Sequence, residues 1–370
     1  MKFTCEKYLF LSAVNICSRA VAAKSTIPTL EGLYISAAGE TIGVVGYDLK
    51  KGIYTTFQAE IEEPGSVVIG SRLLGDITRS LPDGDVTVAC DSSGLVKITC
   101  GDAEFSIMGI DSEDYPELPT VESRDTITIP GEKLKAMIEQ TIFAVSDNEA
   151  RPIYTGAMFE VSGGELTVIS VDGYRMAIRR EKLELDDKAD RSFIVPGTAL
   201  SDVEKITTDE DDVHITLGMK HVSFKIGNTT LVTRRLEGEF INYKKAVPQD
   251  FYINLTVDCK AFKSSIDRVS LIIDDRTRSP LRCTFGNGSL KLHCATPIGR
   301  AEDICPIEGD GRNLEIGFNN RYLLDVLKAV PAEKVKVRLN TGSSPCVIAP
   351  VDENDSFLYM ILPVRLSESR

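Results

Sequence analysis

Two stretches decide the fold, LKAMIEQTIFAV (residues 134–145) and FKSSIDRVSLII (residues 262–273), because one helical pattern occurs in both. Apolar side chains at positions i, i+3, i+4 and i+7 predict an amphipathic helix with one buried face. Only Thr141 departs from this pattern in the first stretch. YLFLSAVNICSRAV (residues 8–21) supplies an earlier copy about as far upstream. The chain therefore contains a long internal repeat, which sets the fold before any local motif does.

A second helix also occurs three times, in stretches that align at Leu74, Leu200 and Leu324. They read SRLLGDITRSLPDGDVTVAC (71–90), GTALSDVEKITTDEDDVHIT (197–216) and NRYLLDVLKAVPAEKVKVRL (320–339). After each helix comes a polar turn and an alternating strand, which begins at Val86, Val213 or Val335.

Two proline-bearing stretches, DYPELP (114–119) and NYKKAVP (242–248), are typical of linkers and set boundaries near residues 121 and 250. We therefore predict three similar α+β domains, at residues 1–121, 122–250 and 251–370. Each is expected to hold two helices and about eight mostly antiparallel strands, arranged as two βαβββ halves. Such domains could form an arc that dimerises into a ring.

Composition favours a cytoplasmic protein of ordinary globular type. No apolar run approaches the roughly 18 residues of a membrane helix, and Glu6 and Lys7 stand where a signal peptide would be apolar. The nine cysteines form no C-x-x-C pair and are predicted to be core residues in a reducing compartment. The net charge of −13 argues against nonspecific coating with nucleic acid, but it does not exclude one basic face.

No motif for catalysis or for a cofactor is visible. Phosphate loops, dinucleotide fingerprints, H-E-x-x-H and G-x-S-x-G are all absent, so we predict no catalytic residue, no metal and no cofactor. Acidic loops at Asp111–Asp114, Asp209–Asp212 and Asp352–Asp355 are ordinarily solvated turns. They leave a metal-dependent hydrolase open as an alternative.

Basic residues lie on or next to most of the predicted helices. If those helices line a ring, an acidic protein presents a weakly positive surface to a phosphate backbone. Ordinary surface helices with i,i+4 ion pairs are the alternative interpretation. The candidates for facing DNA are Arg19, Lys24, Arg72, Arg79, Lys133 and Lys205.

SVDGYRMA (residues 170–177) combines an Asp-Gly turn with Tyr174 and Met176. Asp-Gly between apolar runs predicts a hairpin, because glycine adopts the positive φ that a tight turn requires. If Tyr174 and Met176 are exposed, they mark a surface that binds something. A hairpin with both side chains packed inside is the other interpretation.

The threefold repeat, SVDGYRMA, EGEFINYKKAVP (237–248) and the terminal ILPVRL (361–366) together resemble the bacterial β sliding clamp family, the processivity subunit of DNA polymerase III. The resemblance spans the whole chain. It implies a non-catalytic, head-to-tail homodimer that forms a ring of six domains around double-stranded DNA, with no membrane role. It also implies several partners: the DNA polymerase III alpha subunit, clamp-loader subunits, and other replication and repair clients with short hydrophobic motifs. A peptide-binding scaffold unrelated to DNA stays open as a further alternative.

The resemblance implies a hydrophobic pocket for client peptides between the second and third domains. Tyr154 would come from a strand, Asn319 and Tyr322 from the last helix, and Ile361, Leu362, Pro363, Val364 and Arg365 from the terminal strand. The turn would supply Val171, Gly173, Tyr174, Arg175 and Met176.

Three linker positions depart from the usual residues of the family, namely Ile241, Lys245 and Ala246, and a different peptide preference is implied. The dimer seam would set the helix end with Ile272 and Ile273 against the first-domain edge strand with Phe105. Taken alone, Ile272 and Ile273 are more typical of core residues. The final SESR (367–370) extends past the point where many relatives stop.

Overall fold

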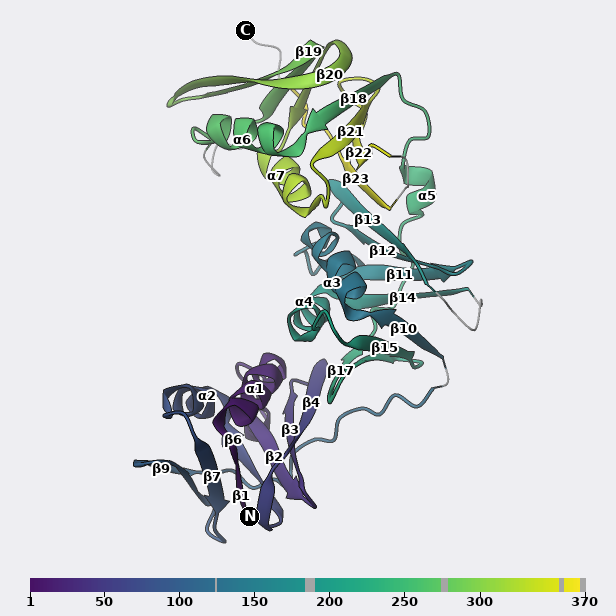
Figure 1. Cartoon of the computed structure of the whole chain (residues 1–370). Coiled ribbons are helices and arrows are strands. Elements are labelled where there is room, and N and C mark those ends of the chain that lie inside the picture. The colour runs from purple at the N-terminus through teal and green to yellow at the C-terminus, as the bar shows by residue number, and fades with distance from the viewer. Residues whose placement is uncertain (124, 184–189, 274–278, 353–355, 367–370) are drawn as a thin grey trace. The chain divides into compact units, whose positions relative to one another are not determined.

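The computed structural model describes residues 1–370 except 124, 184–189, 274–278, 353–355 and 367–370 (Figure 1). Within it the chain forms two compact units. Unit 1 comprises Met1–Lys135 with Thr198–Arg235, and unit 2 comprises Ala136–Gly197 with Leu236–Arg370. The central copy of the repeat is thus divided between the two units.

Unit 1 contains a five-stranded antiparallel sheet in the order β5-β1-β7-β8-β9. Val86 and Val88 of this sheet are fully buried, as the alternating pattern predicts. Strand β9 lies at the edge of the sheet, and it carries Phe105, so the predicted edge position of this residue is confirmed. The strands are β1 (Lys2–Glu6), β5 (Glu60–Glu63), β7 (Asp85–Cys90), β8 (Leu95–Cys100) and β9 (Ala103–Met108).

An eight-stranded antiparallel sheet, in the order β10-β15-β16-β17-β4-β3-β2-β6, completes unit 1. Its strands are β2 (Gly32–Ala38), β3 (Thr41–Tyr47), β4 (Lys51–Gln58), β6 (Gly65–Gly70), β10 (Thr126–Pro130), β15 (Asp212–Leu217), β16 (His221–Ile226) and β17 (Thr229–Arg234). Strands β17 and β4 pair from Thr229↔Thr55 to Thr233↔Lys51. The first and central copies therefore share one sheet.

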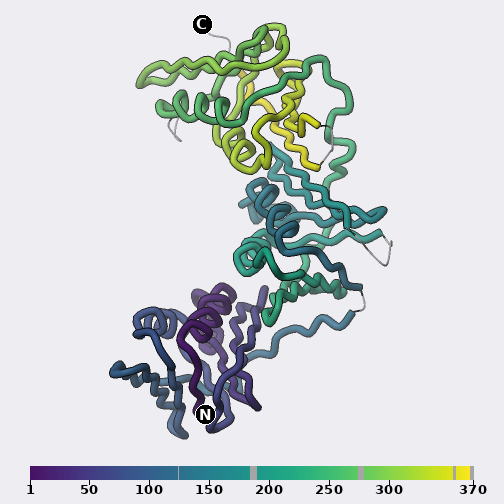
Figure 2. The backbone as a smooth tube through the Cα atoms, viewed as in Figure 1, coloured from purple at the N-terminus to yellow at the C-terminus, as the bar shows by residue number. Residues whose placement is uncertain are grey.

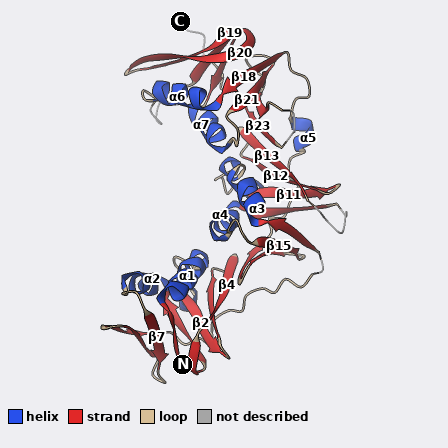
Figure 3. Cartoon of the chain, viewed as in Figure 1, coloured by secondary structure: helices blue, strands red, loops and turns tan. Residues whose placement is uncertain are grey.

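Helices of unit 1 pack on its strands through the predicted apolar stripe. α1 (Lys7–Cys17) buries Phe10, Val14 and Cys17, contacts β3 and β4, and packs against α2 (Ser71–Ser80) (Figure 3). Two further helices, α3 (Gly131–Glu139) and α4 (Gly197–Ile206), cross the boundary between the units in sequence. Residues 116–123 contain no helix or strand and run extended (Figure 2), and the Tyr115 ring just before them lies 5.3 Å from the Tyr34 ring.

Unit 2 is built on a ten-stranded sheet in the order β14-β11-β12-β13-β23-β22-β21-β18-β20-β19. Strands β13 and β23 pair from Arg175↔Ile361 to Arg179↔Phe357, so the central and last copies also share a sheet. The strands are β11 (Gly156–Ser162), β12 (Glu165–Val171), β13 (Arg175–Lys182), β14 (Arg191–Pro196), β18 (Ile253–Asp258), β19 (Leu281–Thr296), β20 (Gly299–Phe318), β21 (Lys334–Leu339), β22 (Cys346–Pro350) and β23 (Phe357–Ile361).

Helices α6 (Cys259–Ser270) and α7 (Asn320–Ala329) pack on each other and on this sheet. Side chains cap both helices: Asp258 accepts a hydrogen bond from the Ala261 amide (2.7 Å), and Asn319 accepts one from the Arg321 amide (3.0 Å). The short elements of unit 2 are the 3-10 turns η3 (Ile142–Ala144) and η4 (Pro152–Thr155) and the helix α5 (Tyr243–Ala246).

The predicted α+β repeat is confirmed, with three differences of detail in the helices. α3 ends at Glu139, two residues before the off-pattern Thr141, whose hydroxyl donates to the Met137 carbonyl (2.7 Å), so the predicted helix is shorter than its pattern. In α7 the fully buried position is Leu323, and Leu324 is half-buried, so the alignment is one residue off in the third copy. The expected linker around Tyr243 forms the helix α5 with that tyrosine buried.

The last copy has fewer, longer strands than the predicted eight. β19 and β20 pair along nearly their whole length, with bulges near Phe285, Asn287 and Ser289. Bulges let one strand bend while it stays paired, so each long strand replaces two expected short ones.

The cysteines lie where the sequence predicts: eight are buried, and Cys90 is half-buried. Within the described ranges, no helix has the length and apolar character needed to span a bilayer.

Candidate functional site

The turn between β12 and β13 is the hairpin that the sequence predicts. Gly173 has φ 94°, which favours glycine. The Asp172 carboxylate accepts hydrogen bonds from the amides of Tyr174 (2.8 Å) and Arg175 (3.0 Å), and the Asp172 amide donates to the Arg175 carbonyl (3.3 Å). These bonds explain why aspartate precedes glycine here, since its side chain closes the turn locally.

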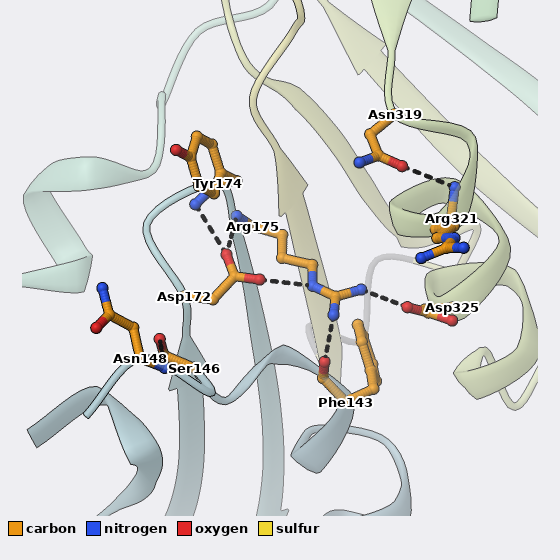
Figure 4. Close-up of polar contacts among 9 residues, drawn as sticks. All are labelled: Phe143, Ser146, Asn148, Asp172, Tyr174, Arg175, Asn319, Arg321 and Asp325. Carbon is orange, nitrogen blue, oxygen red and sulfur yellow. Dashed lines mark hydrogen bonds and ion pairs between the residues drawn. The ribbon is translucent and has the colours of Figure 1, made fainter. Parts of the chain in front are cut away.

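Arg175 connects this turn to two other elements (Figure 4). Its Nε donates to Asp172 Oδ2 (2.9 Å), Nη1 donates to Asp325 Oδ2 on α7 (2.5 Å), and Nη2 donates to the Phe143 carbonyl in η3 (2.6 Å). The side chain is only 11% exposed. A guanidinium buried this deeply is stable because charged and carbonyl acceptors surround it.

Aromatic rings cover the same guanidinium. Arg175 Cζ lies 4.5 Å from the Tyr322 ring centroid and 5.3 Å from that of Phe143. The Tyr174 ring lies nearly parallel to Tyr322, at 6.3 Å and 26°, and is 62% exposed. Burial, and after it the Asp172 carboxylate, raises the pKa of Tyr322, while Arg175 opposes the rise. Tyr174 and Tyr322 thus form a partly exposed aromatic pair beside the hydrogen-bonded Arg175 guanidinium.

Met176 does not belong to this exposed surface, so of the two interpretations of the turn the packed one holds for Met176. It is 1% exposed and packs with Val171, Ile178 and Met360 in a buried cluster. Strand alternation explains the difference: Arg175 and Met176 are consecutive in β13 and point to opposite faces of the sheet. Val171 and Met176 support the turn from beneath.

Tyr154 lies in η4, not in a strand as predicted. Its ring makes an edge contact with Phe240 (5.6 Å, 74°), and the side chain packs against the buried cluster under the turn. Pro152 starts this 3-10 turn, because its fixed φ suits the first helical position.

The three unusual linker residues differ in exposure. Ile241 and Lys245 are exposed, whereas Ala246 packs against the buried cluster under the turn. The buried Tyr243 fixes α5 to β11, because its hydroxyl lies 3.2 Å from a Glu160 carboxylate oxygen. Ile241 and Lys245 are therefore at the surface of unit 2.

The segment that follows β23 contacts the turn through its backbone. β23 ends at the fully buried Ile361, so Leu362, Pro363, Val364 and Arg365 follow the strand and do not continue it as predicted. The Leu362 amide donates to the Tyr174 carbonyl (2.8 Å), and the Val364 amide donates to the Gly317 carbonyl (2.8 Å). Val364 and Arg365 are exposed.

The structure thus joins Tyr174, Arg175, Tyr322 and Leu362 by direct contacts, with Asn319 at the start of α7. It also contains two contributors that the sequence reasoning missed, Phe143 and Asp325. The break at Thr141 could have drawn attention to Phe143, whereas nothing in the local sequence singles out Asp325. Apolar and aromatic side chains around a fixed turn can bind a short apolar peptide.

The candidate DNA-facing residues lie on or beside helices, as predicted, and all are exposed at the surface. Arg19 lies 3.8 Å from Asp202 of α4, and Arg79 pairs with Asp76 at 2.6 Å. Asp202 is itself buried and also pairs with the Lys51 ammonium. Arg72 lies on α2, Lys133 on α3, Lys205 in the last turn of α4, and Lys24 in the loop after the 3-10 turn η1 (Ser18–Ala20).

Of the candidate dimer residues, Ile272 and Ile273 lie beyond the end of α6 and pack against the core of unit 2 while staying partly exposed. The neighbouring Leu271 is 84% exposed. Phe105 is half-buried on β9. Leu271 is therefore the most exposed apolar side chain at this helix end, and sequence reasoning missed it.

The acidic loops behave as turns where the structure describes them. Asp111 accepts a hydrogen bond from the Glu113 amide (3.0 Å), and Asp211 accepts one from the Thr208 hydroxyl (2.7 Å). Glu353, Asn354 and Asp355 lie outside the described residues. In the part of the chain that the structure covers, no group of three or more His, Cys, Asp or Glu side chains could hold a metal ion.

Comparison with known proteins gives one consistent result along the whole chain. Residues 1–119, 128–242 and 244–365 match the N-terminal, central and C-terminal domains of the DNA polymerase III beta subunit. The beta sliding clamp of Staphylococcus epidermidis is 33% identical over 376 residues, which is 99% of each chain. A putative DNA polymerase III beta subunit from Eubacterium rectale superposes with a TM-score of 0.93 at 32% identity, covering 99% of this chain and 100% of that one. The Bacillus subtilis DNA polymerase sliding clamp superposes equally well at 31% identity, with the same coverage.

Proposed function

The chain belongs to the DNA polymerase III beta subunit family, and we propose that it is a non-catalytic sliding clamp that encircles double-stranded DNA as a head-to-tail homodimer. One observation carries the proposal: all three clamp domains match in order along the chain. A protein that surrounds DNA need not bind it tightly, because DNA cannot leave a closed ring. Weak, salt-sensitive contacts from a few basic side chains then permit sliding.

For the dimer, the proposed seam sets β9 with Phe105 against the end of α6 with Ile272 and Ile273. The edge position of β9 supports this, because an edge strand has a neighbour on one side only and leaves its other side open to a second copy. The exposed Leu271 adds apolar surface beside Ile272 and Ile273. A head-to-tail contact of this kind closes into a ring when the rotation permits it.

For the clients, we propose that the surface around Tyr174 and Tyr322 accepts a short hydrophobic peptide. The polymerase III alpha subunit, clamp-loader subunits and other replication and repair proteins would compete for it in the cytoplasm. An exposed tyrosine on a rigid turn is a good anchor, because little conformational entropy is lost when it binds. Ile241, Lys245, Val364 and Arg365 are exposed and could set the peptide preference.

The decisive experiment loads the protein onto a closed DNA circle with a clamp loader, then linearises the circle with a restriction enzyme. A clamp stays on the circle and slides off the linear form, whereas a DNA-independent scaffold shows no difference. The mass in solution should be near twice the 40.5 kDa monomer. Equal retention on circular and linear DNA, or a monomeric mass, would contradict the proposal.

A further inference from the structure

Arg175 is expected to line the peptide surface, but its polar groups face inward. Each of its three guanidinium nitrogens donates a hydrogen bond within unit 2, to Asp172, Asp325 and Phe143. Tyr322 and Phe143 lie close to the guanidinium carbon. With only 11% of the side chain exposed, little of it remains to meet a ligand.

The partners of Arg175 come from separate segments. Asp172 belongs to the β12–β13 turn, Phe143 to η3, and Asp325 to α7, one turn of helix after Tyr322. Residues three apart on a helix share a face, so the guanidinium that binds Asp325 also contacts the Tyr322 ring, at 4.5 Å from its centroid. At the turn, Asp172 binds both Arg175 and the Tyr174 amide. The position of each tyrosine therefore depends on the same guanidinium.

We propose that Arg175 is a positioning residue, which locks the Asp172 turn, η3 and α7 together so that Tyr174 and Tyr322 are presented to the client peptide as a preformed pair. This inference rests on the proposed peptide-binding function of the same surface. Arginine suits the role because its planar fork reaches three acceptors and stacks on rings, whereas lysine offers a single ammonium point charge.

The test compares Arg175→Lys, Asp325→Asn and the double variant in binding a fluorescein-labelled peptide from the clamp-binding segment of the polymerase III alpha subunit. We expect Arg175→Lys to weaken binding about tenfold, the loss of roughly one charge-assisted hydrogen bond. Asp325→Asn should also weaken binding, and the double variant should bind no worse than the weaker single variant, because both break one network. If Arg175 contacted the peptide directly, releasing it from Asp325 would leave affinity equal or higher, and that outcome would overturn the proposal.

A second measurement reports on the arrangement of Tyr174 and Tyr322 in the absence of peptide. The protein contains eleven tyrosines and no tryptophan, so 3-fluorotyrosine can be incorporated and observed by ¹⁹F NMR without peptide. Tyr174→Phe and Tyr322→Phe assign the two signals of interest. Arg175→Lys should shift or broaden both signals and leave those of distant tyrosines in place. Unmoved Tyr174 and Tyr322 signals would overturn the proposal.

Arg268→Lys is the matched control, because Arg268 also pairs with an aspartate, Asp303 (2.5 Å), but on α6 and with 60% of its side chain exposed. It should change neither affinity nor the two signals, and an effect equal to that of Arg175→Lys would count against a specific role. Failure of the unaltered protein to bind the peptide would instead overturn the proposed function, and the NMR result would still decide the role of Arg175.

Discussion

The substitutions Tyr174→Ala and Met176→Ala should have opposite consequences, although the residues are two apart. Tyr174 is mostly exposed, and its described ring contact is with Tyr322, so its loss should lower the free energy of unfolding by only about 0.5–1.5 kcal/mol. Met176 is buried between strands, and its truncation leaves a cavity that costs about 2–5 kcal/mol.

Peptide binding should show the reverse order. If Tyr174 anchors the peptide, Tyr174→Ala should cost at least about 2 kcal/mol of binding free energy, which is roughly a 30-fold weaker affinity. Met176→Ala should weaken binding less, because the side chain does not reach the surface. Fluorescence anisotropy with the labelled alpha-subunit peptide gives the affinities, and urea unfolding followed by circular dichroism gives the stabilities.

Tyr252→Ala serves as the control, since Tyr252 is a 72% exposed tyrosine of unit 2 outside the aromatic pair. It should leave both peptide affinity and stability nearly unchanged. Peptide affinity of Tyr174→Ala within twofold of the unaltered protein would refute the anchor role. A fully stable Met176→Ala variant would refute the packing argument.

Three further predictions concern other parts of the chain. Leu271→Asp should shift the solution mass from dimer toward monomer with little loss of monomer stability, whereas Ile272→Asp should lower both the dimer fraction and the monomer stability. Light scattering measures the mass and thermal unfolding measures the stability. An unchanged dimer mass for both variants would reject this seam. Asp202→Asn should lower the free energy of unfolding by about 1–3 kcal/mol, because it leaves the half-buried Lys51 ammonium without its carboxylate partner, and a melting temperature within a degree of the unaltered protein would contradict this. Burial raises the pKa of Cys346 from 9.0 to about 12, so its stabilising contribution is fully present below pH 9 and is lost as the pH rises toward 12. Native protein at pH 8 should therefore not be alkylated at Cys346 by iodoacetamide. Rapid alkylation without unfolding would contradict the burial of this thiol.

Local patterns in the sequence predict the local structure well. The helix periods at Leu134 and Phe262, the strands led by Val86 and Val213, and the turn at Gly173 all follow from spacing and from backbone preference. Each depends on residues within a few positions of one another, which is the range over which such rules act.

Contacts between distant segments were not predictable in the same way. The acceptors of the Arg175 guanidinium on Phe143 and Asp325 lie 32 and 150 residues away in the chain, and no spacing rule connects them. The burial of Met176 depends on where β13 begins, because a strand that starts at Arg175 sends the next side chain into the core. The pairing of β17 with β4 likewise depends on how two copies of the repeat meet.

That pairing, together with the pairing of β13 with β23, means that the boundaries of the repeated copies differ from those of the sheets. Cutting the gene at residue 121 would free the β4 edge along Lys51–Thr55, and cutting it at 250 would separate β13 from β23. Bare strand edges recruit other chains, so a lone copy expressed from such a fragment should aggregate. The repeat is a unit of the sequence, and only the joined copies pair these strand edges within one chain.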